Sequence, residues 1–124
     1  MWIKANPNPD HQEVPDCVIR AISIATNRSW DDIYWDLCRL GGVMHNMPSA
    51  DAVWGKYLYE QGFEPFLLPV SCPMCTTIKT FAQIYKRGTY IIGTGSHAVA
   101  VINGNYFDSW DSGNEVPSFF WKIR

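Results

Sequence analysis

The sequence has few charged residues and no region in which one sign dominates. Its 124 residues include 10 Lys and Arg and 12 Asp and Glu, which gives a formal net charge of −2 at pH 7. The basic residues are scattered, and Lys86 and Arg87 form the one tight pair. Because phosphate backbones and anionic headgroups are bound by concentrated basic surfaces, we expect neither a nucleic-acid partner nor a membrane partner.

The chain also lacks a secretion signal and any long apolar run. Its first residues, MWIKANPNPD, have no apolar segment behind a basic start. No stretch reaches the roughly 18–20 apolar residues that a membrane helix needs. We therefore expect a cytoplasmic protein in which the cysteines are free thiols rather than disulfides. The four cysteines are Cys17, Cys38, Cys72 and Cys75.

Internal repeats, low-complexity tracts and long linkers are absent as well. The composition, 47% hydrophobic and 15% aromatic, is that of a globular chain. A chain of this length can bury one moderate core without help from a metal or a disulfide. The sequence therefore predicts a single domain over residues 1–124.

Helix signals dominate the chain as far as residue 88. A polar, proline-rich arm over 1–16 ends at Asp16, an N-cap residue whose carboxylate suits the positive end of a helix dipole. Ser29 opens a capping-box sequence, and Gly41-Gly42 is expected to stop the helix that follows. The sequence predicts four helices, over 17–26, 30–40, 50–60 and 78–87.

Strand signals take over after residue 88, where short runs rich in β-branched and aromatic residues alternate with turns. Asn103-Gly104 lies between two such runs and suits a type I′ hairpin turn. An earlier segment, residues 63–70, contains prolines and predicts an edge strand or a packed loop. Helices followed by an antiparallel sheet indicate the α+β class. The four later strands are expected over 89–95, 97–102, 106–110 and 118–123.

Cys17 is the first candidate for chemistry because it begins a helix. The helix dipole and the free backbone N–H groups there lower the pKa of a thiol, and the thiolate is the nucleophile of thiol hydrolases. The N–H of Cys17 itself can help to hold the oxyanion that forms when a carbonyl is attacked. The alternative is a buried and inert cysteine. Arg20, one helical turn later, is expected to pair with an acid such as Asp16.

His97 and Asp108 are the second and third candidates. If Asn103-Gly104 forms the turn, Val99 pairs with Asp108, and strand alternation places His97 diagonal to Asp108 on one face. The carboxylate can then hold one imidazole nitrogen while the other takes a proton from Cys17. The alternatives are a histidine with a structural role in its strand and a surface acid close to a turn.

Two blocks of the sequence resemble a known group of enzymes. DCVIRAISIATNRSWDDIYWDL and GTYIIGTGSHAVAVINGNYFDSWDSG are similar to small phage and bacterial proteins of the papain-like superfamily, which are related to the bacteriocin-leader (double-glycine) peptidases. The resemblance implies a papain-like α+β fold with Cys17 as nucleophile, His97 as base and Asp108 as orienting acid. Asp111 is a nearby substitute for this last role.

The same resemblance implies an amide side chain in the oxyanion hole, from a residue upstream of the nucleophile. Asn8 and Gln12 are the two candidates, and Asn8 is favoured because Asn8-Pro9 matches an Asn-Pro that precedes the cysteine in the phage-type relatives. Gln12 is one residue closer to the cysteine than the glutamine of leader peptidases. We expect Trp110 and Ser96 to line the substrate groove, with Trp110 also able to shield the His–Asp pair from water.

These features predict a cysteine peptidase or amidase that acts on a peptide or protein through a thioester, without cofactor or metal. Acyl transfer or deamidation by the same three residues is one alternative. A non-catalytic papain-like module that binds a protein, such as a phage protein acting on a host partner, is the other. Cys72-Pro73-Met74-Cys75 is interpreted as two thiols in a helix-entry loop rather than a redox or metal site. The sequence predicts no oligomeric state.

Overall fold

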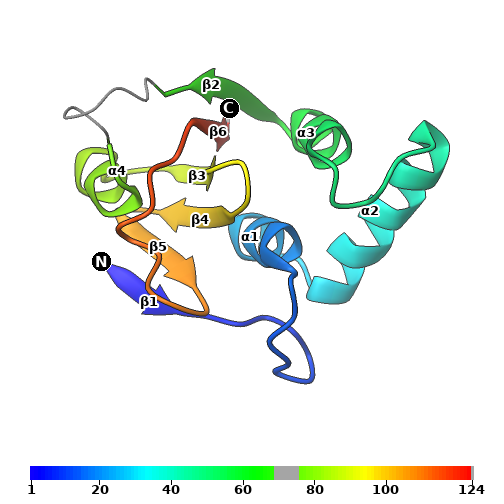
Figure 1. Cartoon of the computed structure of the whole chain (residues 1–124), viewed down its shortest axis with the longest axis horizontal. Helices are drawn as coiled ribbons and strands as arrows, with labels where there is room; N and C mark the ends of the chain where they lie inside the picture. Colours follow the sequence, from blue (N-terminus) through cyan, green and yellow to red (C-terminus); the bar gives the residue numbers. More distant parts are fainter. Residues whose placement is uncertain (69–75, 124) are drawn as a thin grey trace.

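A six-stranded sheet forms the centre of the molecule. The computed structural model describes residues 1–68 and 76–123, and Figure 1 shows the strands stacked one above another with helices at both sides. The strands are β1 (Trp2–Lys4), β2 (Phe63–Leu67), β3 (Thr89–Gly93), β4 (Ala98–Ile102), β5 (Asn105–Asp108) and β6 (Phe119–Ile123). They lie in the order β1-β5-β4-β3-β6-β2. Strands β1 and β5 are parallel, and the other neighbours are antiparallel.

Helices cover both faces of this sheet, which gives the α+β architecture that the sequence predicts. The helices are α1 (Cys17–Thr26), α2 (Trp30–Met44), α3 (Asp51–Glu60) and α4 (Ile78–Ile84). On one face α1 packs against β4 and α3 contacts β2, with α2 packed on α1 and α3, and α4 packs on the other face (Figure 1). None of the helices in the described ranges combines the length and apolarity that a membrane crossing requires.

The central strands are apolar on both sides because both faces are covered. Ile91 and Ala100 point into the core beneath α1–α3, whereas Ile92 and Val99 point into the core beneath α4. All four side chains are at most 1% exposed. Strand β4 is therefore fixed between two cores, and the segment that leads into it is held against the start of α1.

The predicted hairpin between β4 and β5 is confirmed. Asn103 and Gly104 have φ of 50° and 83°, the left-handed conformation that a type I′ turn needs at both positions. The pairing of Ile102 with Asn105 and of Ala100 with Phe107 follows the predicted register. Of the two alternatives for the segment after α3, an edge strand or a packed loop, the structure shows the edge strand β2, which contains Pro65.

The predicted arm over 1–16 is not extended throughout: it begins with a strand, and it turns at Pro9-Asp10, where the N–H of His11 donates to the carbonyl of Asn8 at 2.9 Å. Trp2–Lys4 pairs with β5, whose residues lie about a hundred positions away, and the Trp2 indole donates to the carbonyl of Asp108 at 3.2 Å. A strand of three residues is too short to show the alternating pattern by which strands are predicted. Strand β1 forms because the fold brings β5 beside it.

Two helix ends were predicted wrongly. Gly41-Gly42 does not stop α2, which continues to Met44 and ends at His45 in the left-handed conformation. Gly41 instead permits a close approach, because a Cβ there would lie 2.8 Å from the carbonyl oxygen of Asn46. Helix α4 ends at Ile84, three residues before the expected end at 87.

Gly93 is required for packing beside the candidate site. A Cβ at this position would lie 2.2 Å from the Phe119 ring, whereas a Cβ on Gly42, in α2, meets nothing within 4 Å. We expect Gly93→Ala to lower the free energy of unfolding by about 1–3 kcal/mol through overpacking. The matched change Gly42→Ala should raise it by about 0.5–1 kcal/mol. Denaturant unfolding measures both, and equal effects would contradict the packing argument.

Candidate active site

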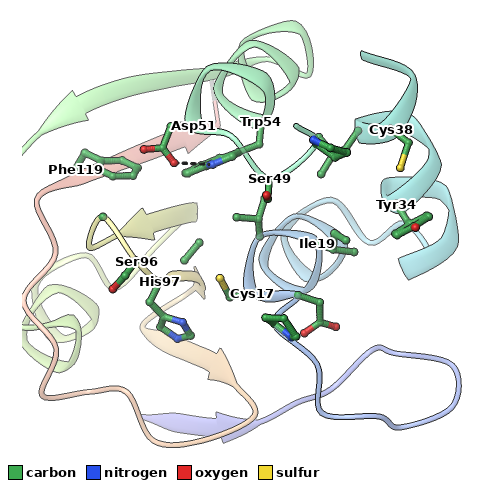
Figure 2. Close-up of a pocket in the computed structure, with 17 residues that line it drawn as sticks. Cys17, Ile19, Tyr34, Cys38, Ser49, Asp51, Trp54, Ser96, His97 and Phe119 are labelled. Atoms are coloured by element: carbon green, nitrogen blue, oxygen red, sulfur yellow. Dashed lines mark hydrogen bonds between the residues drawn. The ribbon is translucent and has the colours of Figure 1, made fainter. Parts of the chain in front are cut away.

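Cys17 and His97 meet where the start of α1 approaches the start of β4. Cys17 is the first residue of α1, and His97 lies one residue before β4 rather than at the beginning of the strand as expected. Figure 2 shows the Cys17 sulfur and the His97 ring beside each other at the pocket. Each of the two groups shifts the pKa of the other. The contact follows from the packing of α1 on β4.

The environment of Cys17 favours its thiolate. Partial burial alone would raise the pKa of the thiol, but the hydrogen bonds from His97 and from the backbone N–H of Ala98 outweigh it. The positive charges of His97 and Arg20 act in the same direction, so the pKa of Cys17 lies below its ordinary value.

His97 is held in a defined orientation by Asp108. Its Nε2 lies 2.6 Å from Asp108 Oδ2, which leaves Nδ1 for the thiol. Burial disfavours the charged ring, but the hydrogen bonds with Asp108 and Cys17 and their negative charges raise the pKa of His97 to about 9. At neutral pH the His97 ring therefore carries a positive charge, which favours the thiolate form of Cys17.

Asp108 is the most deeply buried member of the site, with 1% of its surface exposed. Burial would raise the pKa of the carboxyl group, but the contacts with His97 and Ser112 and the N–H of Ser109 bring it below the usual range. Ser112 Oγ donates to Oδ2 at 2.6 Å, and the N–H of Ser109 donates to Oδ1 at 2.8 Å. The expected substitute, Asp111, instead accepts from the Tyr106 hydroxyl at 2.6 Å.

Arg20 connects the two halves of the site. As expected, it pairs with Asp16, and it also donates from Nη2 to Asp108 Oδ1 at 3.0 Å. The Trp30 indole donates to the second oxygen of Asp16 at 2.8 Å. Asp16 occupies the N-cap position as predicted, but its side chain caps nothing because Arg20 and Trp30 hold both oxygens.

A pocket of about 350 Å³ opens on one side of Cys17 and His97 (Figure 2). Its walls come from the start of α1, from α2, from the loop before α3 and from Phe119, and they are mainly apolar. Such a pocket suits a bulky side chain. Sequence reasoning missed most of these residues because they come from separate elements; among them are Tyr34, Leu37, Cys38, Ser49 and Trp54.

A second hollow, of about 390 Å³, lies on the other side of the same pair. Trp110 forms one wall, with its ring centroid 5.0 Å from that of His97, and Ser96 lines both hollows. The structure therefore places Trp110 and Ser96 beside the pair, as the sequence predicts for a substrate groove. A bound chain can pass over Cys17 with groups on both sides.

The two predicted amide side chains lie elsewhere. Neither Asn8 nor Gln12 lines either hollow that contains Cys17. Asn8 Oδ1 accepts the backbone N–H of Asp10 at 2.9 Å and that of Gln12 at 3.4 Å, and so shapes the N-terminal loop. The structure does not bring an upstream amide to the thiol, because this side chain is used in a local turn.

Donors for an oxyanion are nevertheless present at the start of α1. The first helical hydrogen bond is donated by Arg20 to the carbonyl of Asp16. Among the residues that the structure describes, none accepts from the N–H groups of Cys17, Val18 and Ile19. These N–H groups belong to residues that line the apolar pocket.

The structure describes two of the four cysteines that the sequence predicts to be free thiols. Cys17 and Cys38 are free, and Cys72 and Cys75 lie outside the described residues. Within residues 1–68 and 76–123, no group of three His, Cys, Asp or Glu side chains is placed to hold a metal ion.

The arrangement as a whole has the parts of a nucleophilic site: a thiol with a lowered pKa, a proton-carrying imidazole, a buried carboxylate and free backbone donors. A thiolate in this position can attack a carbonyl carbon, and the imidazolium can protonate the group that leaves. The chain matches no protein-family model, no curated protein and no solved structure.

Proposed function

We propose that this protein is a papain-like cysteine hydrolase that cleaves a peptide or related amide bond. The hydrogen-bonded series Cys17–His97–Asp108 carries the proposal, because it combines a lowered thiol pKa with a raised imidazole pKa at one opening. A helix that begins with the cysteine and packs on an antiparallel sheet bearing the other two residues supports the papain-like assignment.

In the first half of the reaction the Cys17 thiolate attacks the carbonyl carbon and forms a C–S bond. The carbonyl electrons move to oxygen, and the free N–H groups at the start of α1 stabilise this oxyanion. As the C–N bond breaks, His97 gives its Nδ1 proton to the leaving amine. The products of this half are a thioester on Cys17 and a neutral imidazole.

The second half regenerates the enzyme. His97 takes a proton from a water molecule, the hydroxide attacks the thioester carbon, and the C–S bond breaks. Asp108 keeps the imidazole oriented while its charge changes. Trp110 packs on the His97 ring, which protonates the leaving amine, so we place the leaving group in the hollow beside Trp110 and the acyl group in the apolar pocket.

The pH dependence of Cys17 alkylation by iodoacetamide tests the proposal. In the wild type we expect half-maximal reaction at a pH well below the 8.5 or so of a free thiol. His97→Ala removes the imidazolium and should raise that midpoint by about one pH unit or more. Labelled Cys17 is quantified by peptide mass spectrometry, with Cys17→Ser as the blank.

The opposite result is equally informative. If Cys17 reacts as an ordinary or buried thiol whatever residue occupies position 97, no activated pair exists and the hydrolase proposal fails. A non-catalytic binding module would give that result, because it has no need of an ionised cysteine. Circular dichroism of each variant shows whether the change is confined to the site.

A further inference from the structure

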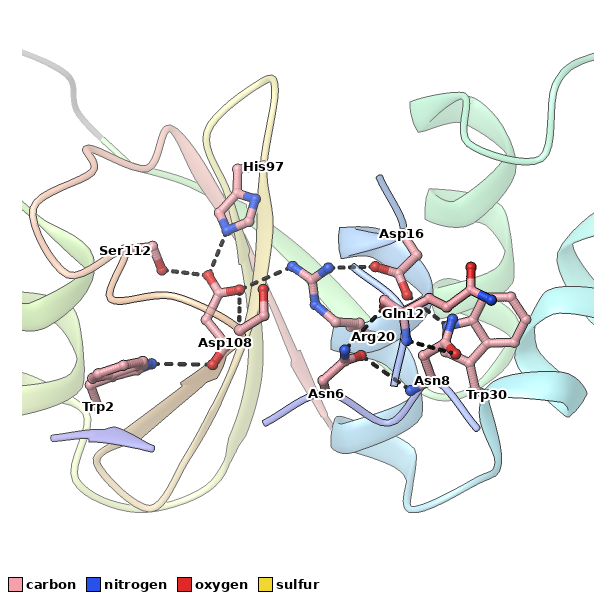
Figure 3. A network of polar contacts seen from close by, with 11 residues as sticks. Trp2, Asn6, Asn8, Gln12, Asp16, Arg20, Trp30, His97, Asp108 and Ser112 are labelled. Carbon is pink, nitrogen blue, oxygen red and sulfur yellow. Dashed lines mark hydrogen bonds and ion pairs between the residues drawn. The ribbon is translucent and has the colours of Figure 1, made fainter. Parts of the chain in front are cut away.

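Arg20 is a buried cation whose partners are two acids of the site. It is 7% exposed and lies between Asp16, 5% exposed, and Asp108, 1% exposed. Figure 3 shows one guanidinium reaching from α1 to both carboxylates, with His97 at one end of the series and Trp30 at the other. The reaction steps proposed above do not use this residue.

We propose that Arg20 is a positioning residue for the proposed hydrolysis, with a separate effect through each carboxylate. Through Asp108 it fixes the acid that orients His97. Through Asp16 it keeps a carboxylate off the N–H groups that receive the oxyanion. The inference rests on the proposed function. It names the residue that keeps Asp108 oriented and the oxyanion donors free.

The effect on Asp108 follows from which oxygen is bound by which partner. Oδ2 faces His97 at 2.6 Å and accepts from Ser112, while Oδ1 accepts from Arg20 at 3.0 Å and from the N–H of Ser109. Because both oxygens are occupied, the carboxylate cannot rotate away from the imidazole. Three donors besides His97 fix this rotation: the Ser112 hydroxyl, the N–H of Ser109 and the Arg20 guanidinium. Of these three, Arg20 is the charged one.

The effect on Asp16 concerns the residue immediately before the nucleophile. An Asp at the N-cap ordinarily accepts from a first-turn N–H of its own helix. Here Oδ1 is bound by Arg20 and Oδ2 by the Trp30 indole, and no cap hydrogen bond forms. Without Arg20 the carboxylate would be free to cap α1, where it would occupy the oxyanion donors and repel the developing charge.

Arginine suits this role because its planar group presents donors in two directions. Asp16 and Arg20 are four residues apart, on one face of adjoining helical turns, so one guanidinium nitrogen reaches back to the helix start. The other reaches across to the sheet. A lysine keeps the charge but offers one ammonium point, which cannot hold both carboxylates in these geometries.

The decisive variant is the double change Arg20→Met with Asp16→Asn. It removes one buried charge of each sign, whereas Arg20→Met alone would leave two buried carboxylates facing each other. Arg20→Lys is the second variant and keeps the charge, so it decides the question if the double variant does not fold. Arg28→Met is the control for loss of an arginine–aspartate pair, because Arg28, in the segment after α1, pairs with Asp36 of α2 at 2.8 Å, in a more exposed position away from Cys17.

Two quantities are measured on folded protein: the pH midpoint of Cys17 alkylation and the hydrolysis of an N-acyl-phenylalanine 4-nitrophenyl ester. We expect the double variant and Arg20→Lys to hydrolyse the ester about 10- to 100-fold more slowly, as small displacements of catalytic groups do. The double variant should also raise the alkylation midpoint. Arg28→Met should lower the melting temperature while leaving the alkylation midpoint and the hydrolysis rate unchanged.

The outcomes distinguish a failure of the Arg20 role from a failure of the proposed hydrolase function. If the folded Arg20 variants keep wild-type hydrolysis and a wild-type midpoint while His97→Ala shifts the midpoint, the hydrolase proposal stands and Arg20 is only structural. If His97→Ala has no effect either, both proposals fail together. A loss in Arg28→Met as large as in the Arg20 variants would overturn the positioning role, since the effect would then follow from stability alone.

Discussion

Replacing Cys17 with serine will lower the hydrolysis of an N-acyl-phenylalanine 4-nitrophenyl ester by at least about 1,000-fold, with the fold intact. The reason is the nucleophile itself. The imidazolium of His97 and the backbone N–H of Ala98 lower the pKa of the Cys17 thiol and so favour its anion. A serine hydroxyl has a far higher pKa and stays protonated in the same surroundings, so no anion is available for attack.

Cys38 provides the matched control for this prediction. It is a free cysteine on α2 that lines the apolar pocket beside Cys17, and it lacks the contact to His97 that Cys17 makes. We expect Cys38→Ser to retain ester hydrolysis to within about three-fold, and mass spectrometry of the wild type with a slow ester to find the acyl group on Cys17. If Cys38→Ser loses as much activity as Cys17→Ser, the nucleophile has been assigned to the wrong thiol.

Features of the fold that depend on neighbouring residues could be predicted from the sequence. The hairpin follows from Asn103-Gly104, where the side chains tolerate positive φ, and the start of α2 follows from Ser29, whose side chain accepts from Asp32 at 3.1 Å. Features that depend on distant partners could not. Strand β1 exists because β5 lies beside it, and α2 passes through Gly41-Gly42 because the chain after it packs back on Gly41.

The same distinction applies to the site. His97 and Asp108 could be paired from the sequence because the two-residue turn at Asn103-Gly104 fixes which residues of the two strands lie opposite each other. The link from Arg20 to Asp108 spans 88 positions and has no local signature. An expectation carried from the resemblance placed Asn8 beside the thiol, whereas its side chain holds a turn in the N-terminal loop.

Replacing Asp108 with asparagine will lower ester hydrolysis by about 1,000- to 10,000-fold and will also destabilise the fold. An asparagine presents both an acceptor and a donor, so it no longer fixes which imidazole nitrogen carries the proton. It also removes the negative charge that raises the pKa of His97 to about 9. The imidazolium will therefore be lost at lower pH, and the alkaline limit of the residual activity will move down from the region of pH 9.

Stability will change with pH in a defined direction. The pKa of Asp108 is lower in the folded chain than the 3.9 or so of an unfolded aspartate, so its contribution is present above that value and is lost as the pH falls through the folded pKa. Removing a partner from a buried ion pair costs about 3–5 kcal/mol, and Arg20 would lose one of its two acids. Urea unfolding should show Asp108→Asn to be less stable than the wild type by this amount at pH 7 and by a smaller amount at pH 3.

Asp111→Asn is the control that separates this effect from a general loss of negative charge near the site. Asp111 lies three residues further along the chain, and its carboxylate is bound by the Tyr106 hydroxyl and the N–H of Gly113 rather than by His97. We expect this variant to hydrolyse the ester within about three-fold of the wild type and to keep the alkaline limit near pH 9. If instead Asp108→Asn keeps its activity and Asp111→Asn loses it, the orienting acid is Asp111, and the His97–Asp108 contact serves the fold alone.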